Sequence, residues 1–341
     1  MRAIVILALC SALNLNADCQ TTHSDSIYFH QQLNSFAKGN NLRRFNYLKK
    51  YATRNQLTNV KVKTQGIDWL GIYRNVIVEK KGEVDSVVYI VCHYDKIDGN
   101  IISLVNLFIN GSLDIILSNT FLSQGGYDNG TGVVSSLALM HWINDKPMHY
   151  TYRFLFAGME EYGLRGSRRH VSSLSLKEWS KCVYAINIDM IAGKGINGVT
   201  MTEDVSHAVL KNLARHTSAR TGIVMQEAQL PGHASSDFHS FKGQSFKKDF
   251  AVSFSSNFVG ALIPQRSYFT KVKAGIPVIN FTDDIRLNVA ESFSIFSPVS
   301  FGQIHSLHDK RTRVGINNLV KYSTFFQSFI EAIDDRKTDF K

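Results

Sequence analysis

The feature that most limits the fold of this chain is a set of largely apolar runs, each followed by an acidic or histidine side chain. The runs are Val87–Cys92, Thr151–Ala157 and Val183–Ile188. A strand that is apolar along its whole length is typical of a parallel sheet covered on both faces. Segments with helical periodicity separate the runs. The pattern therefore predicts an α/β domain with a mainly parallel central sheet flanked by helices.

Other segments complete this picture. Apolar residues at three- and four-residue steps predict two helices within residues 25–54, with a break at Lys38–Asn41. Further strands are expected at Val60–Val62, Asn75–Val78 and Ile276–Phe281, and further helices at 203–218 and 316–335. No internal repeat or low-complexity linker divides the chain, so we expect one domain over residues 18–341.

The first 17 residues have the pattern of a secretory signal peptide. Met1-Arg2 is a short positive start, Ala3–Leu15 is mostly apolar, and Ala17 is a small residue at a plausible cleavage point. We expect a secreted or periplasmic protein without stable membrane insertion after signal removal. The alternative is an N-terminal anchor, but the run falls short of the about 20 apolar residues that a membrane span needs.

Charge and motif content exclude several classes of protein. The net charge is +10, but the basic residues are dispersed without an aromatic-basic stripe, so nucleic acid is not an expected partner. Gly193–Gly198 matches GxGxxG by letter, yet Val199–Met201 looks extended, which argues against dinucleotide binding. GxSxG, P-loop and HExxH motifs are absent from the sequence.

The cysteines do not form a metal-binding pattern. Cys10 lies in the signal segment, and Cys19, Cys92 and Cys182 remain, an odd number without CxxC spacing. A zinc-cysteine site is therefore not expected. One disulfide is compatible with an oxidising compartment, and the pair is left open. Because neighbouring side chains of a strand diverge, Cys92 should point away from His93 into the core.

Acidic and histidine side chains gather where the apolar runs end. His93, the pair Glu160-Glu161 and Asp189 each follow one run, and Asp128 lies at a glycine-rich bend before a helix. In open parallel sheets, ligands bind beside the carboxyl ends of the strands. We therefore expect these side chains to meet at one edge of the sheet.

Such a concentration of carboxylates requires a positive charge between them, because like charges repel. Oxygen and imidazole ligands suit zinc, with cobalt or manganese as substitutes. A two-metal site activates a water molecule and stabilises a tetrahedral oxyanion. A free carboxylate nearby must then take the water's proton and pass it to the leaving amine. Adjacent glutamates at a strand end can divide these tasks.

Taken together and in order, these motifs resemble peptidase family M28, the aminopeptidase-type di-zinc metallopeptidases. The motifs are His93-Tyr94-Asp95, Asp128-Asn129-Gly130-Thr131-Gly132, Glu160-Glu161-Tyr162-Gly163-Leu164-Arg165-Gly166-Ser167, Asp189, and Ile304-His305-Ser306-Leu307-His308-Asp309. The resemblance extends from about residue 75 to residue 310, and weakly over the N-terminal helices. It implies a zinc-exopeptidase-like fold and two bound Zn²⁺ ions.

The resemblance also implies a role for each residue. Asp128 bridges the two metals, His93 and Asp189 bind one metal, and Glu161 and His305 bind the other. Glu160 is the general base, and Asp95 is the acid that orients His93. His305 is preferred to His308 as the ligand because its spacing to Asp309 matches the family pattern. The Asp128-Asn129 peptide is expected to be the family's non-proline cis bond.

Two segments depart from the family pattern. The distance from His93 to Asp128 is long for the family, which suggests an insertion at about 97–124 near the site entrance. Ser235–Phe241 resembles the family's Ser-Asp-His segment, but Gly275-Ile276-Pro277 follows late, which suggests a second insertion at about 244–272. Each is interpreted as a lid or pocket wall, or alternatively as a surface excursion.

These observations together predict a secreted or periplasmic di-zinc aminopeptidase that releases N-terminal residues from peptides with a free N-terminus. Three alternatives remain open at this point. Two are a glutaminyl cyclase-like transferase and a carboxypeptidase on the same fold. The third is a metal-binding but catalytically silent ectodomain that acts through partners. The intact set of ligands and the presence of Glu160 favour an enzyme.

Overall fold

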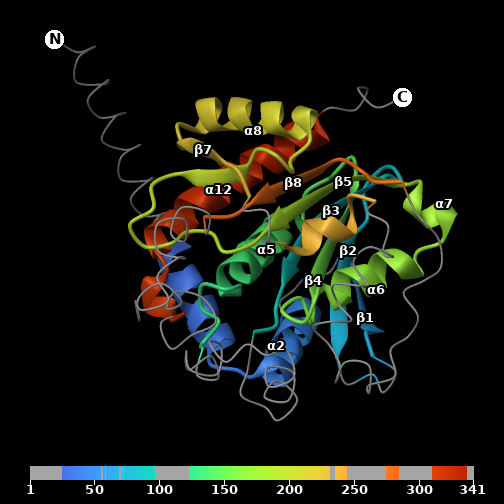
Figure 1. Ribbon diagram of the computed structural model, residues 1–341, viewed down its shortest axis with the longest axis horizontal. Helices are drawn as coiled ribbons and strands as arrows, with labels where there is room; N and C mark the ends of the chain where they lie inside the picture. Colours follow the sequence, from blue (N-terminus) through green and yellow to red (C-terminus); the bar gives the residue numbers. More distant parts are fainter. Residues whose placement is uncertain are drawn as a thin grey trace.

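The computed structural model describes residues 25–54, 57, 59–68, 71, 73–96, 123–230, 235–243, 274–283 and 309–335. Its centre is an eight-stranded mixed sheet with the strand order β1-β2-β4-β3-β5-β8-β6-β7 (Figure 1). The strands are β1 (Val60–Gly66), β2 (Arg74–Lys80), β3 (Val87–His93), β4 (Thr151–Ala157), β5 (Cys182–Ile188), β6 (Val199–Thr202), β7 (Met225–Ala228) and β8 (Val278–Phe281).

The middle of the sheet is parallel, as the apolar runs predict. β4, β3, β5 and β8 run in the same direction, with Ile90 opposite Phe154 on one side and opposite Ile186 on the other. Every residue of β3 is buried. The pairs β1–β2, β2–β4 and β6–β8 are antiparallel. The predicted α/β class is confirmed, and antiparallel strands extend the parallel centre on both sides.

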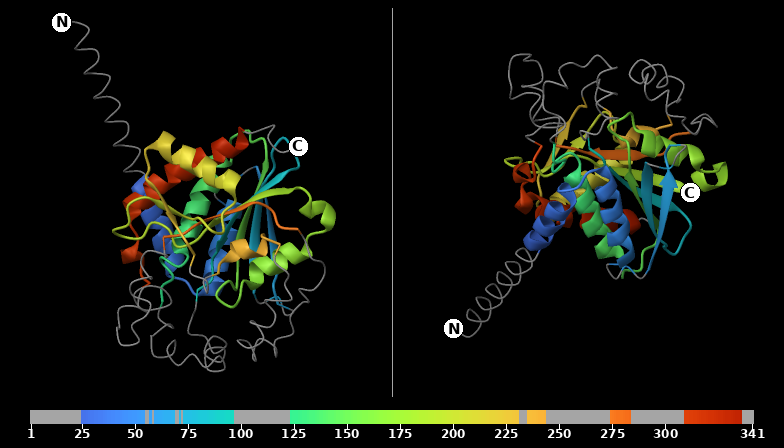
Figure 2. Two further views of the ribbon diagram at one scale, coloured as in Figure 1. Left: turned by 45° about the horizontal axis from the view of Figure 1, so that its top comes forward. Right: turned by 90° about the horizontal axis from the view of Figure 1, so that it is seen from below.

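Helices cover both faces of the sheet (Figure 2). A helix over residues 25–37, α2 (Asn41–Arg54), α5 (Gly130–Ile143), α8 (Ala208–Thr221) and α12 (Ile316–Asp334) contribute to the larger apolar core on one face. On the other face, α6 (Arg165–Ser173), α7 (Leu176–Trp179) and the 3-10 helix η2 (Asp237–Ser240) contribute to a second core. A second 3-10 helix, η3 (Arg311–Arg313), precedes α12.

Several local predictions are confirmed. The N-terminal segment forms two helices with a break before Asn41. The GxGxxG-like stretch leads into strand β6 at Val199 and not into a helix. Cys92 packs in the larger core, and the thiols of Cys92 and Cys182 are buried and form no disulfide. The helix expected from residue 203 begins at Ala208, because the His207 ring accepts a hydrogen bond from the Val209 amide and caps it.

Some predicted features lie outside the described residues. They are the signal segment 1–17, most of the first expected insertion (97–122), all of the second (244–272), Cys19, His305 and His308. Among the helices that the structure describes, we find no segment with the length and apolar character needed to cross a membrane.

Candidate metal centre

Parallel strands bring the predicted site residues to one edge of the sheet. His93 is the last residue of β3 and pairs with Ala157 at the end of β4. Glu160-Glu161 follow β4, and Asp189 follows β5. Residues in the left-handed backbone conformation turn the chain beside these acids, with φ of 59° at Met159 and 50° at Met190. Such conformations cost on the order of 1–3 kcal/mol for non-glycine residues and cluster at functional sites.

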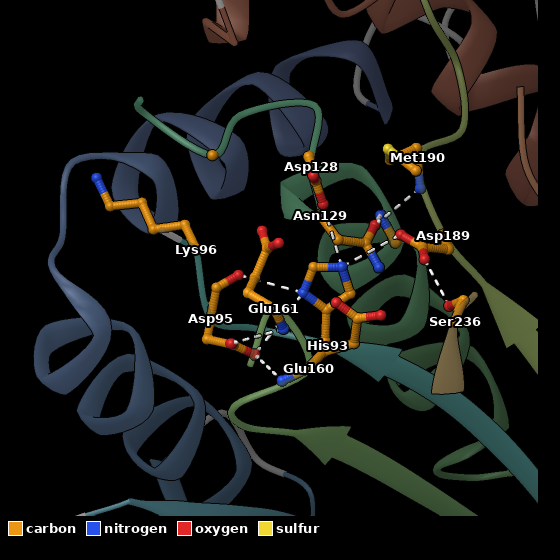
Figure 3. Close-up of polar contacts among 12 residues, drawn as sticks. His93, Asp95, Lys96, Asp128, Asn129, Glu160, Glu161, Asp189, Met190 and Ser236 are labelled. Carbon is orange, nitrogen blue, oxygen red and sulfur yellow. Dashed lines mark hydrogen bonds and ion pairs between the residues drawn. The ribbon is translucent and has the colours of Figure 1, made fainter. Parts of the chain in front are cut away.

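The His93 imidazole lies at the centre of the cluster (Figure 3). Its Nε2 atom is 3.1 Å from Asp128 Oδ1 and 3.3 Å from Asp189 Oδ1. All three side chains are at least 95% buried. The ring nitrogen therefore faces two carboxylate oxygens, the arrangement that a cation between imidazole and carboxylates requires.

Glu161 adds a third carboxylate to this group. One ligand atom from each of His93, Asp128 and Glu161 can be chosen so that all lie within 4.8 Å of one another. Imidazole nitrogen and carboxylate oxygen are ligands of Zn²⁺ in proteins. These residues therefore fit a zinc ion by type of atom and by spacing. His305, the remaining predicted ligand, lies outside the described residues.

The bend that carries Asp128 is fixed by two polar side chains. Asp309 Oδ1 accepts hydrogen bonds from the amides of Tyr127 (2.8 Å) and Asp128 (3.3 Å). Asn129 caps α5 by accepting from the Gly132 amide at 2.9 Å, and it donates to the Ile188 carbonyl. The Asp128-Asn129 peptide bond is cis, as expected.

Gly132 is required by the close approach of this bend to β5. A Cβ atom at this position would lie 2.3 Å from the Ile188 carbonyl oxygen. Any side chain here would push the start of α5 away from β5. The glycine of the motif thus keeps Asp128 close to Asp189, which follows Ile188.

Asp95 contacts His93 in a different way from the prediction, which assigned the contact to the Asp95 carboxylate. Its main-chain carbonyl oxygen is the nearer partner of His93 Nδ1, at 3.2 Å, and its carboxylate is 3.7 Å from the same nitrogen. The carboxylate also accepts hydrogen bonds from the amides of Glu160 (3.1 Å) and Glu161 (3.4 Å). Asp95 therefore orients His93 largely through the main chain, and it ties the two glutamates to the end of β3.

Sequence reasoning missed the side chains that hold Asp189. Ser236 donates a hydrogen bond of 2.6 Å to Asp189 Oδ2, and Asn187 donates to Ser236 at 2.9 Å. This leaves Asp189 Oδ1 directed toward His93. The resemblance of residues 235–241 to a family segment was the only signal for Ser236, and it did not predict which residue Ser236 would contact.

The cluster shifts the pKa values of its members in the metal-free protein. Burial disfavours a charged imidazole, but Asp189 and Glu160 more than offset this effect and raise the pKa of His93 well above its usual value. Burial, with Glu161 and Asp237 adding to it, raises the pKa of Glu160 well above its usual value, although His93 opposes the shift. Burial also raises the pKa of Asp237 to about 7.

These shifts predict how the stability of the metal-free protein depends on pH. Burial and the neighbouring Asp128 raise the pKa of Asp309 to about 6. Carboxyls such as Asp309, Asp237 and Glu160 hold protons in the folded state at pH values where the unfolded chain has lost them. Stability therefore falls as pH rises through these folded-state pKa values, by up to about 1.4 kcal/mol per pH unit for each titrating group. The raised pKa of His93 acts with the same sign.

We expect the melting temperature of protein treated with a chelator to fall between pH 5 and pH 8. Zinc-loaded protein should not show this fall, because deprotonated ligands bind the metal more tightly as pH rises. Differential scanning calorimetry in matched buffers checks both curves. A chelator-treated protein whose melting temperature rises over this range would contradict the described charge arrangement.

Comparisons with known proteins agree with this geometry. A stretch of 65 residues is 38% identical to the probable leucine aminopeptidase 2 of Aspergillus oryzae, covering 19% of this chain and 13% of that protein. The chain spans a fifth or less of the length of the curated relatives it matches.

Solved structures share the fold. A zinc aminopeptidase from Bacillus subtilis superposes with a TM-score of 0.52 at 19% identity, covering 78% of this chain and 51% of that chain. A glutaminyl cyclase from an Acidobacteriales bacterium superposes with a TM-score of 0.61 at 16% identity, covering 92% and 95%. The model of peptidase family M28 matches residues 75–255, which include His93, Asp128, Glu160, Glu161 and Asp189. More than half of the sequence thus matches that model, and the chain belongs to peptidase family M28.

Proposed function

We propose that this protein is a di-zinc aminopeptidase that removes N-terminal residues from peptides. The observation that carries the proposal is the convergence of His93, Asp128 and Glu161 within 4.8 Å of one another, with Glu160 next in sequence. The aminopeptidases among the relatives support the choice of reaction. The ligand types support zinc, with cobalt or manganese as substitutes.

In this proposal, His93 and Asp189 would hold one ion, Glu161 and His305 would hold the other, and Asp128 would be the ligand that both ions share. When bound, the ions supply a Lewis acid that polarises the scissile carbonyl and lowers the pKa of water. Glu160 accepts the proton from the attacking water and delivers it to the leaving amine. Asp95 holds the backbone of Glu160 while the proton moves.

The choice of His305 as ligand is tested by a matched pair of substitutions. We expect His305→Ala to lower the bound zinc from two ions to about one, because a ligand of one ion is lost. His308→Ala, three residues away, should keep both ions. Metal content measured by plasma mass spectrometry after dialysis distinguishes the two variants. Full zinc content in His305→Ala would assign the ligand elsewhere.

A glutaminyl cyclase is the second candidate. Solved glutaminyl cyclases match this chain over nearly their whole length, 95% and 97% for two of them, whereas the Bacillus aminopeptidase is matched over about half. These likenesses concern the fold. The motifs Asp128–Gly132 and Glu160–Ser167 favour the peptidase, because they resemble the peptidase versions more closely.

A defined peptide pool tests both candidates at once. The pool contains peptides with free, acetylated and glutamine N-termini, and it is followed by mass spectrometry after incubation with zinc-loaded protein. Stepwise loss of residues from free N-termini alone is the expected result. Loss of ammonia from the glutamine peptides would instead identify a cyclase, and trimming from the carboxyl end a carboxypeptidase. An unchanged pool with two metals bound would favour a binding role.

We also propose a secreted or periplasmic location. The positive start and apolar run of residues 1–17 support it. N-terminal sequencing of protein recovered from the extracellular or periplasmic fraction should begin at Asp18. A protein that retains residues 1–17 and sediments with membranes would support the anchor alternative.

A further inference from the structure

The first turn of α2 places a fully buried guanidinium behind the metal centre. Arg44 is 0% exposed, and its side chain donates hydrogen bonds to three main-chain carbonyls. Nη1 bonds the Tyr94 carbonyl at 3.0 Å. Nη2 bonds the carbonyls of Gln124 and Gly125, the latter at 2.9 Å. One arginine thus joins two segments that are distant in the sequence.

Asn41 makes a second connection from the same turn. Its side-chain amide donates to the Lys96 carbonyl at 2.9 Å, and its oxygen accepts from the Lys96 amide at 3.0 Å. We refer to Asn41 and Arg44 together as the α2 clamp. Both residues precede the stretch matched by the family model, which begins at residue 75.

The clamped segments carry the metal-site residues. Tyr94 lies between His93 and Asp95, and Gly125 precedes Asp128 within the same bend. Movement of either segment by one or two ångströms would separate His93 Nε2 from Asp128 Oδ1, which are now 3.1 Å apart. Asp309 and Asn129 also hold the second segment, and Lys96 Nζ donates to the Ser123 carbonyl. Arg44 differs from these partners because one side chain bonds both segments at once, so its contacts bear directly on this distance.

The charge of Arg44 also faces the cluster. Burial lowers the pKa of Arg44 to about 10, while Asp309, Asp95, Asp128 and Glu161 raise it. The guanidinium is therefore charged at neutral pH. It attracts the same carboxylates that a metal ion would attract. It does so from its position against the main-chain carbonyls of the two segments.

Gly125 is fitted to this arginine. It has a φ of 54°, in the left-handed region, and an added Cβ atom would lie 2.4 Å from Arg44 Nη2. A side chain at residue 125 would therefore displace the guanidinium. The backbone conformation and the missing side chain together leave the space that Arg44 occupies.

From this geometry we propose that the α2 clamp, with Arg44 at its centre, is a positioning device that holds the segments bearing His93 and Asp128 at metal-binding distance before any metal is bound. The inference rests on the proposed function in that these side chains are taken as metal ligands. Arg44 does not touch the substrate or the metal, and it acts through the carbonyls of Tyr94, Gln124 and Gly125.

Two effects of removing Arg44 have opposite signs, which makes the proposal testable. Loss of a positive charge beside the carboxylates would by itself strengthen zinc binding. Loss of the connections to the carbonyls would disorganise the ligands and weaken zinc binding. The clamp predicts that the second effect is larger. Lysine keeps the charge but lacks the planar fork of donors, so Arg44→Lys separates charge from geometry.

The experiment compares Arg44→Met and Arg44→Lys with two controls on the same helix. Arg43→Met makes the same change of charge at an exposed neighbouring position. Leu48→Ala removes a buried apolar side chain and lowers overall stability without removing a hydrogen bond to either segment. For each protein, zinc affinity is measured by competition with a chromophoric chelator. Hydrogen exchange of the metal-free form is followed by mass spectrometry.

We expect Arg44→Met and Arg44→Lys both to bind zinc about 10–100-fold more weakly, the range typical of partners that orient metal ligands. In both variants the metal-free protein should exchange amide hydrogens faster at residues 93–96 and 124–130, with the strands of the sheet unchanged. Arg43→Met should match the wild type. Leu48→Ala should have a lower melting temperature with wild-type zinc affinity.

Several results would overturn the clamp. Tighter zinc binding in Arg44→Met, with wild-type behaviour in Arg44→Lys, would mean that Arg44 affects zinc binding only through its positive charge. Equally weakened zinc binding in Leu48→Ala would mean that Arg44 affects zinc binding only by stabilising the fold as a whole. If Arg44→Met does not fold, Arg44→Lys and Asn41→Ala decide, and wild-type exchange in both contradicts the proposal. If the wild type binds no zinc, the proposed function fails, while the exchange data on metal-free protein still test the clamp.

Discussion

Replacing Glu160 with glutamine is expected to lower kcat by about 10²–10⁴-fold, the usual contribution of a general base, while both zinc ions remain bound. The carboxamide has nearly the same shape as the carboxylate but cannot accept the proton of the attacking water. Its backbone amide still donates to Asp95, so the local structure should persist. Steady-state kinetics with an N-terminal chromogenic amino-acid amide, together with metal analysis, provide the measurement.

The matched control is Glu161→Gln, one residue further along the same turn. Because Glu161 belongs to the group that can hold a metal, this variant should lose zinc and activity together. Excess zinc in the assay should restore part of its activity, whereas it should not restore Glu160→Gln. The opposite pattern, with metal loss in Glu160→Gln and full metal in Glu161→Gln, would exchange the roles of the two glutamates.

Asp128→Asn is expected to abolish metal binding at both positions and to lower kcat/KM by at least about 10³-fold. A carboxylate shares one negative charge between two oxygens and can therefore offer an anionic oxygen to each of two cations, whereas a carboxamide is neutral and has a single oxygen. The metal ions contribute several kcal/mol of stabilisation to the transition state, and about 1.4 kcal/mol corresponds to a factor of ten in rate. Metal analysis and calorimetric titration with zinc provide the measurement.

Asp145→Asn serves as the control for Asp128→Asn, since it makes the same chemical change at an exposed position. It should retain two zinc ions and wild-type kinetics. Asp189→Asn should lose only the ion shared with His93. If Asp128→Asn retained both ions, Asp128 would not lie between them, and another carboxylate of the cluster would have to bridge.

The sequence predicted the fold, and the gathering of acidic and histidine side chains at one edge of the sheet, for a physical reason. Uniformly apolar strands are buried on both faces, so their carboxyl ends meet at one edge, and the residues that follow them are brought together by the sheet itself. The side chains of His93, Glu161 and Asp189 could be identified in this way, whereas Asp128 was identified from the glycine-rich bend before α5. Antiparallel pairing of β1, β2 and β6 was not predicted, because short strands carry no sign of their direction.

The partners that hold the candidate metal-site residues were harder to predict. Ser236 and Arg44 act through contacts between segments that are distant in sequence, with separations of 47 residues for Ser236–Asp189 and 81 residues for Arg44–Gly125. A serine or an arginine in a helix carries no local signal of such a contact. The use of the Asp95 main chain was also hidden, because residue type says little about which atom of a residue meets a neighbour.

The hydrogen bond from the Tyr127 amide to Asp309 joins positions 182 residues apart. A contact of this separation forms late, because a long loop must close before the contact returns any energy. During synthesis, the bend that carries Asp128 therefore waits for a segment made much later. Under the proposed function, zinc capture and hydrolysis would therefore depend on a segment made late in synthesis.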